Sequence, residues 1–145
     1  MRDAPRTILD LARIVVGEFA GDAEAIGRDR TAHQVQVLLR RVYGVGEGIA
    51  SMGVILLARC RGERFPDWSG INVKPDAHVR RVLYRLGVAA KADEADAVEA
   101  AARLNPEYPG ALDPALWVIG RRWCREKGPK CAECVMGGLC ARVGV

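Results

Sequence analysis

Apolar side chains recur every three or four residues along most of the chain, which is the spacing of one face of an α-helix. No stretch alternates apolar and polar residues as a half-buried strand does, so we expect an all-α protein. Helices are predicted at 7–19, from Thr31 to about Val42, from about Glu47 to Cys60, from Asp76 to Leu86, at 92–104, and from Asp113 to Cys124.

The same periodicity predicts which side chains are buried. In the first helix the stripe expected to face the core comprises Ile8, Leu11, Ala12, Val15 and Phe19. Cys60 is expected to be a buried free thiol, and Trp117 and Trp123 to shield the core or a bound group. In the fourth helix, His78 is expected to pack or form a hydrogen bond within the helix. Arg80, Arg81 and Arg85 are interpreted as its solvated face.

Composition excludes several classes of protein. Half of the 145 residues are apolar, which indicates a globular chain rather than a disordered one. No apolar run reaches the roughly 18 to 20 residues of a membrane span, so no membrane partner is expected. The first residues do not resemble a secretory signal, and the sequence therefore indicates a protein of the reducing cytoplasm.

A glycine-rich turn separates the second and third predicted helices. It reads Gly44-Val45-Gly46, with Gly48 two residues further on. Glycine allows a tight turn and close approach to a ligand, and the free N–H groups at the start of the following helix can bind an anion. An ordinary turn between two packed helices is the alternative interpretation.

Four of the five cysteines lie close together near the end of the sequence. Cys124, Cys131, Cys134 and Cys140 have the spacing C-x6-C-x2-C-x5-C. Thiolates select zinc, copper(I) or iron–sulfur clusters. A zinc site of four thiolates usually pairs two C-x2-C units, whereas only one is present here, so the spacing favours a [4Fe–4S] cluster. Two disulfides are disfavoured in a reducing compartment and would leave one cysteine over.

The excess of basic over acidic residues is confined to the same region. Basic and acidic residues balance at 16 each as far as Trp117, but after it six basic residues face two acidic ones. Arg125, Lys127 and Lys130 lie within the cysteine segment itself. A phosphate-binding surface and local neutralisation of a negatively charged cluster explain this excess equally well.

The cysteine spacing, following a helix that contains Trp117, resembles the iron–sulfur loop of the endonuclease III branch of the helix-hairpin-helix DNA glycosylases. This resemblance implies an all-α fold with a helical lobe at 1–112 and a cluster lobe at 113–145. It also implies a [4Fe–4S] cluster on the four cysteines and double-stranded DNA as the partner. The backbone of the hairpin, Gly44, Val45, Gly46 and Gly48, would hold DNA phosphates, and Arg125, Lys127 and Lys130 would contact the DNA near the cluster.

Asp76 opens a segment, Asp76 to Val82, that is similar to the family's Asp-x-His-Val-x-Arg-Val signature. The resemblance places the family's catalytic aspartate at Asp76. A carboxylate there could stabilise positive charge on the sugar as a damaged base leaves, and could orient or deprotonate a water molecule. The simpler interpretation of Asp76 is a helix N-cap, and the two roles are compatible.

The chain departs from the family at one chemical position. Gly48 stands where the bifunctional members have the lysine that forms a Schiff base with the sugar, so the expected enzyme is a monofunctional glycosylase. Lys74 is a weaker candidate amine. The alternative function is a non-catalytic DNA-binding or redox-sensing [4Fe–4S] module.

The resemblance covers only the second half of the family's protein. A homodimer or a partner chain is therefore expected to complete the helical domain, and the predicted location is the cytoplasm, associated with the nucleoid.

Overall fold

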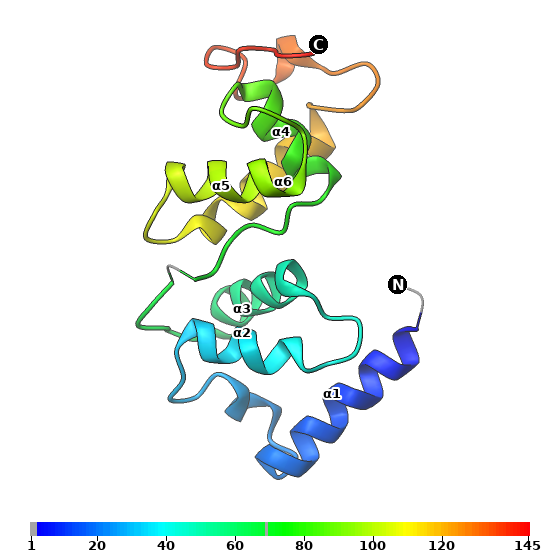
Figure 1. The fold of residues 1–145 in the computed structure, drawn as a ribbon, viewed down its shortest axis with the longest axis vertical. Coiled ribbons are helices and arrows are strands. Elements are labelled where there is room, and N and C mark those ends of the chain that lie inside the picture. Colours follow the sequence, from blue (N-terminus) through cyan, green and yellow to red (C-terminus); the bar gives the residue numbers. More distant parts are fainter. Residues whose placement is uncertain (1–2, 69) are drawn as a thin grey trace. The chain divides into compact units, whose positions relative to one another are not determined.

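The computed structural model describes residues 3–68 and 70–145. Within these residues every regular element is a helix (Figure 1), which confirms the predicted all-α class. The helices are α1 (Ala4–Phe19), η1 (Ala23–Ile26), α2 (Ala32–Arg40), α3 (Glu47–Arg61), α4 (Ala77–Leu86), α5 (Glu94–Leu104), η2 (Pro109–Leu112), α6 (Asp113–Arg122) and η3 (Cys131–Glu133), where η marks a 3-10 helix.

The chain divides into two compact units, Met1–Ile71 and Asn72–Val145. The first contains α1 to α3, and the second contains α4 to α6 and the cysteine segment. The boundary expected at 112/113 concerns where a cluster lobe would begin, and it stays a prediction.

The first unit is built on the packing of α2 against α3. Thr31 forms a capping box with Gln34 at the start of α2, which satisfies two backbone donors. Val35 and Val54 are fully buried. The core also contains a polar pair, because the Gln36 amide donates to Ser51 Oγ at 2.8 Å.

The predicted stripe of α1 is only partly buried. Phe19 is covered, but Ile8 is 66% exposed and Leu11 is also exposed, so the expectation of a continuous core face is wrong. Periodicity identifies an apolar face, yet the described residues of this unit cover only the C-terminal half of that face. These exposed side chains alone do not support the predicted homodimer or partner chain.

The second unit places α4 against α5 and α6. Its buried residues include Val79, Val82 and Leu83 from α4 and three alanines, Ala97, Ala100 and Ala101, from α5. Helix α6 approaches α4 at Gly120, where an added Cβ would lie 2.7 Å from the Cβ of His78. Glycine is therefore required for this close contact. Gly87, at a φ of 79°, ends α4, a backbone conformation that glycine adopts without strain.

One further burial prediction is wrong. Cys60 is exposed rather than buried, because it lies about two and a half helical turns after the buried Ser51 and so faces the opposite side of α3. Trp117 is 37% exposed, and its ring packs edge-on against that of His78 of α4, with 6.1 Å between the ring centres. Among the described residues, no helix combines the length and the apolar character that crossing a membrane requires.

Candidate functional site

The glycine turn between α2 and α3 presents backbone rather than side chains. Gly44 has a φ of 77°, and Val45 N–H donates to Val42 O at 3.1 Å. Gly46 is the N-cap of α3 and has no side chain with which to cap it. Gly44 and Gly46 are exposed, and Val45 and Gly48 are half-buried. This geometry fits backbone binding of an anion, a role that stays a prediction.

Helix α1 fixes the residue that precedes this turn. Tyr43 O accepts a hydrogen bond from Thr7 Oγ1 at 3.0 Å, and Tyr43 N–H donates to Asp10 Oδ2 at 3.3 Å. The guanidinium of Arg6 lies 3.8 Å from the centre of the Tyr43 ring. Apolar periodicity could not predict these contacts with Tyr43, because they come from the polar face of α1.

Asp76 is the N-cap of α4, as the sequence predicts. Its Oδ1 accepts hydrogen bonds from His78 N–H at 2.8 Å and Val79 N–H at 3.0 Å. No hydrogen bond from a described residue reaches its Oδ2. The carboxylate is half-buried, so one oxygen anchors the group and the other remains available. Capping and a chemical role are therefore compatible in the geometry.

Arg81 joins α4 to the start of the cysteine segment. Its Nε donates to Cys124 O at 2.7 Å, and its NH2 lies 2.9 Å from His78 Nδ1. A guanidinium only donates, so Nδ1 of His78 is the acceptor and the ring proton is on Nε2. The predicted hydrogen bonding of His78 within its helix is confirmed. The interpretation of Arg81 as a solvated residue is wrong, because backbone carbonyls of α6 and Cys124 hold it.

Arg85 is also buried, at 9% exposed, against the expectation of a solvated face. Its guanidinium donates to Arg125 O at 2.6 Å and Glu126 O at 3.3 Å, and lies 3.7 Å from Cys124 Sγ. Its own carbonyl lies 3.3 Å from Cys140 Sγ. One α4 residue therefore contacts both the first and the last of the four cysteines.

The four predicted ligand cysteines line a single small cavity of about 20 Å³. All are free thiols. Trp123 lines the same cavity, in agreement with its predicted shielding role. An added Cβ at Gly137 would lie 3.1 Å from the carbonyl oxygens of Cys131 and Cys134, so this loop closes tightly around the sulfurs.

In the described residues, no three His, Cys, Asp or Glu side chains form a group that could hold a metal ion. The sulfurs therefore border one space without converging on one point. A single zinc ion needs four ligands at one centre, whereas a cube gives each cysteine its own iron. Four thiolates are a donor set that a cluster accepts, and the [4Fe–4S] assignment stays a prediction.

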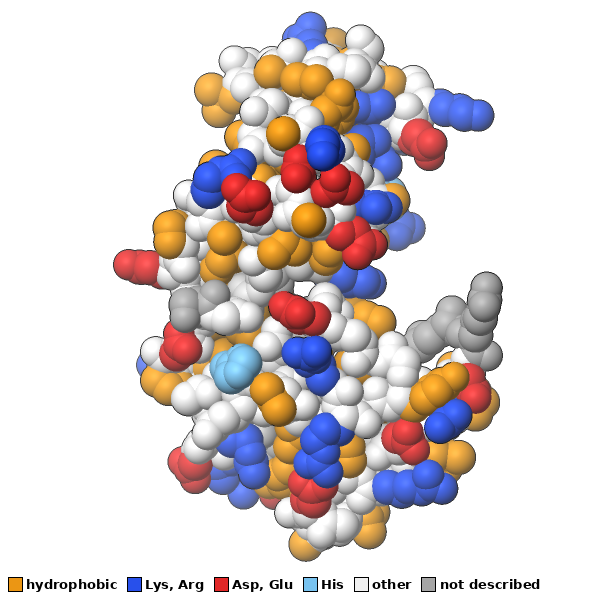
Figure 2. Space-filling model, viewed as in Figure 1, with side chains coloured by type: hydrophobic (Ala, Val, Ile, Leu, Met, Phe, Trp, Pro, Cys, Tyr) orange, Lys and Arg blue, Asp and Glu red, His pale blue; other side chains and the backbone are white. Residues whose placement is uncertain are grey.

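Basic side chains lie beside this cavity. Arg125 and Lys127 are exposed, while Lys130 Nζ is 3.3 Å from Glu133 Oε2. The guanidinium of Arg121 lies 4.9 Å from the centre of the Trp117 ring. Figure 2 shows Lys and Arg side chains following one another along one edge of the second unit. Such an edge suits a polyanion, and the DNA contacts stay predictions.

Asp113 is a buried carboxylate near Asp76 that the sequence presented only as a helix start. It is 8% exposed, and its Oδ2 accepts a hydrogen bond from Lys74 N–H at 2.5 Å. Burial raises the pKa of Asp113, the Lys74 hydrogen bond opposes the rise, and the charge of Asp76 adds to it. Two carboxylates therefore lie close enough to influence one another.

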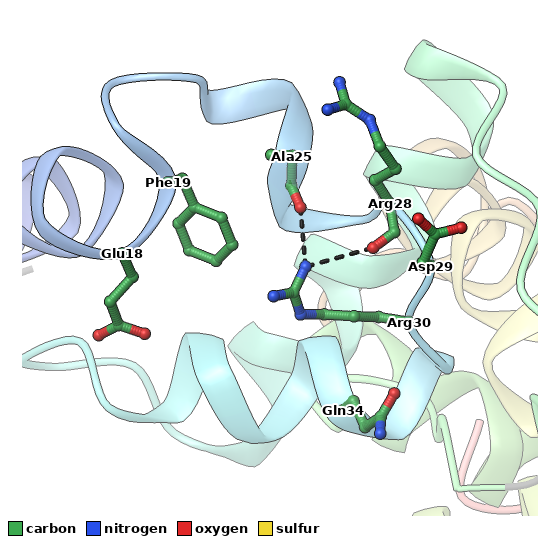
Figure 3. Close-up of a pocket in the computed structure, with 7 residues that line it drawn as sticks. All are labelled: Glu18, Phe19, Ala25, Arg28, Asp29, Arg30 and Gln34. Atoms are coloured by element: carbon green, nitrogen blue, oxygen red, sulfur yellow. Dashed lines mark hydrogen bonds between the residues drawn. The ribbon is translucent and has the colours of Figure 1, made fainter.

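The first unit has an open cavity of about 630 Å³ between α1, η1 and α2. Figure 3 shows the Arg30 guanidinium directed towards the carbonyls of Ala25 and Arg28. The same guanidinium lies 4.9 Å from the centre of the Phe19 ring. These contacts give Arg30 a structural role in tying α1 and η1 to the start of α2.

The chain resembles endonuclease III of Thermotoga maritima. The two sequences are 28% identical over 144 residues, which make up 96% of this chain and 57% of the relative. No family model matches the sequence. The similarity supports the endonuclease III-like family that the motifs suggest, and the chain spans a little over half the length of this relative.

Proposed function

We propose that this protein is a glycosylase of base-excision repair that hydrolyses the N-glycosidic bond of a damaged or mismatched base in double-stranded DNA. One observation carries the proposal. Helix α4 bears the Asp76 carboxylate at its N-terminus and, through Arg81 and Arg85, holds the cysteine segment along its length. The similarity to endonuclease III supports the same function.

Asp76 would act on the sugar after the base is extruded from the helix. Cleavage of the N-glycosidic bond develops positive charge on the deoxyribose, and a fixed carboxylate stabilises that charge. Oδ1 is held by two backbone N–H groups, so Oδ2 can face the sugar or a water molecule. Removal of a proton from that water is the general-base part of the reaction.

Cys124, Cys131, Cys134 and Cys140 would hold a [4Fe–4S] cluster. When bound, this group would cross-link the C-terminal segment and supply a one-electron redox centre. The residues around the cavity fit it, because Arg85 places positive charge 3.7 Å from Cys124 Sγ. Such charge complements the negative charge that four cysteine ligands would bring to a cluster.

DNA would be held by backbone and side-chain groups together. The exposed turn formed by Gly44, Val45, Gly46 and Gly48 would donate N–H groups to phosphate oxygens. Arg125, Lys127 and Lys130 would add charge-assisted contacts beside the cluster. A protein acting on chromosomal DNA would work in the cytoplasm at the nucleoid.

The expected reaction stops at base removal. Gly48 has no amine with which to form a Schiff base, so strand cleavage through that position is not expected. The experiment that tests the proposal is excision from a panel of duplexes carrying deaminated, oxidised, alkylated or mismatched bases. Breaks that appear at one lesion only after alkali treatment support a monofunctional glycosylase. Breaks without alkali contradict the monofunctional assignment.

A non-catalytic DNA-binding or redox-sensing [4Fe–4S] module is the second candidate. Gly48 favours it, since glycine stands where the resemblance places the lysine with which the bifunctional members form a Schiff base. The same panel separates the two candidates. Binding of every duplex with one common salt dependence, and no base released from any of them, supports the binding module and contradicts the glycosylase.

A further inference from the structure

We propose that Asp113 is a positioning residue that fixes the Asp76 carboxylate through the turn Lys74-Pro75-Asp76. This inference rests on the proposed function, because it gives a purpose to the orientation of Asp76. It adds a second carboxylate, from a different helix, to the site.

Asp113 contacts the segment that precedes α4. Asp113 is at the first position of α6, and its Oδ2 accepts the Lys74 N–H at 2.5 Å. The two residues are 39 positions apart in sequence, so this bond ties α6 directly to the segment before α4. Hydrogen bonds to an ionised acceptor are stronger than neutral ones, so an ionised Asp113 would hold this N–H firmly.

A second hydrogen bond connects Lys74 to Asp76. Asp76 N–H donates to Lys74 O at 2.7 Å, which closes a tight turn around Pro75. The proline ring restricts φ at the central position. A shift of the Lys74 peptide would therefore be transmitted to the backbone of Asp76 and to its side chain.

The segment is also anchored on its other side. Asn72 Nδ2 donates to Val98 O of α5 at 3.2 Å, and Val73 is buried. Asn72 is thus held by α5 and Lys74 by α6, immediately before the candidate catalytic carboxylate. Without Asp113, the Lys74 peptide would lose its hydrogen bond to α6.

The surroundings of Asp113 are energetically unfavourable for a carboxylate that has only a structural role. It is almost fully buried and close to a second negative group, the Asp76 carboxylate. Burying a charge requires compensation, and Asn could accept the same N–H without the charge. The hydrogen bond, rather than the charge, is what the positioning role requires, and this distinction makes the role testable.

The test uses two matched duplexes, one with a cationic pyrrolidine abasic-site analogue and one with a neutral tetrahydrofuran analogue. The pyrrolidine carries positive charge where the sugar develops it, so the ratio of the two affinities reports how well Asp76 is placed. This ratio does not require knowledge of the natural lesion. A merely structural change would weaken binding of both duplexes equally.

Wild type is expected to prefer the cationic duplex. Asp113→Ala should lower that preference by about tenfold, the order expected for loss of a charge-assisted hydrogen bond, with little change on the neutral duplex. Asp113→Asn should restore most of the preference, and Asp22→Ala, which removes the cap of η1 in the other unit, should leave it unchanged. An unchanged preference in Asp113→Ala, or an equal loss in Asp113→Asn, overturns the proposal.

Amide hydrogen exchange keeps the inference separate from the proposed function. The Lys74 and Asp76 amides should be protected in wild type and Asp113→Asn and should exchange faster in Asp113→Ala. If wild type shows no preference for the cationic duplex while this pattern holds, the catalytic role of Asp76 fails and the structural coupling stands. Equal exchange in all three proteins overturns the coupling itself.

Discussion

Arg81 Nε donates a hydrogen bond to the backbone carbonyl of Cys124 at 2.7 Å. The same guanidinium reaches Gly120 O at 3.2 Å and His78 Nδ1 at 2.9 Å. One side chain of α4 therefore connects the end of α6, the first cysteine and the helix that Asp76 caps. The cysteine segment and the candidate catalytic helix are one structural unit at this point.

Replacing Arg81 should destabilise the second unit. Arg81→Ala leaves the half-buried carbonyls of Gly120 and Cys124 without this donor, at an expected cost of about 1–3 kcal/mol. Urea unfolding followed by far-UV circular dichroism measures the change. Arg122→Ala is the matched control, since Arg122 is exposed and its guanidinium lies 5.5 Å from the centre of the Trp123 ring. Equal stability of the two variants would refute the linking role.

Iron content should depend on four cysteines and not on the fifth. Protein purified without oxygen is expected to be brown and to carry about four irons per chain. Replacement of any one of the four cysteines by serine (Cys124, Cys131, Cys134 or Cys140) should lower the iron content. Cys60→Ser, at an exposed site, should not. Zinc at one ion per chain in place of iron would exclude the cluster.

Gly120→Ala should loosen the contact between α6 and α4. The new Cβ would overlap that of His78 at 2.7 Å, and such overpacking costs about 1–3 kcal/mol. Gly17→Ala is the control, because it is also within a helix but meets open space, and it should stabilise by up to about 1 kcal/mol. Thermal unfolding of both variants distinguishes them, and a shift in the same direction for both would contradict the close packing.

Asp113 should make stability fall as the pH rises out of the acid range. Burial raises its pKa above the ordinary value of 3.8, so the folded protein keeps this proton to a higher pH than the unfolded chain does. The favourable contribution is complete below the ordinary value and is lost as the pH rises through the raised pKa. Asp113→Asn lacks this titration.

The unfolding free energy of wild type relative to Asp113→Asn should therefore decline as the pH rises above 3.8 and through the raised pKa. Urea unfolding of both proteins at several pH values gives that difference, from which the titrations of groups that do not interact with Asp113 cancel. A difference that is constant with pH, or that grows, would contradict the burial of this charge.

The basic residues near the cysteines should contribute to the salt dependence of DNA binding. Each phosphate contact accounts for a slope of about one in a plot of log affinity against log salt. Lys127→Gln should reduce the slope by about that amount, whereas Lys91→Gln, a change at another exposed lysine of the same unit, should not. If the two variants have the same slope as wild type, Lys127 makes no phosphate contact.

The sequence predicted the helices well because apolar periodicity, capping residues and glycine stops agree with one another. Asp76 caps its helix as expected, and Thr31 and Asp93 also cap helices. The cysteines could be grouped by spacing alone, and they do line one cavity. Local patterns carry this kind of information because the groups involved are close in the chain.

Contacts between segments far apart in the sequence could not be predicted from such local patterns. Arg81 and Arg85 looked like a solvated face, since nothing local shows that the carbonyls of Cys124 to Glu126 lie over them. Asp113 looked like a helix start for the same reason. The exposure of Ile8 depends on which surfaces other segments cover, a property that helical periodicity does not encode.

The most direct test of the account is base release by Asp76→Asn under single-turnover conditions, at matched iron content. Asp93→Asn is the control, because Asp93 is also an aspartate N-cap and Asn is an equally good capping residue. We predict that wild type and Asp93→Asn release the same base at similar rates and that Asp76→Asn is slower by at least about a hundredfold. Release by Asp76→Asn at the wild-type rate would show that this carboxylate is only a helix cap, and the glycosylase mechanism built on it would be wrong.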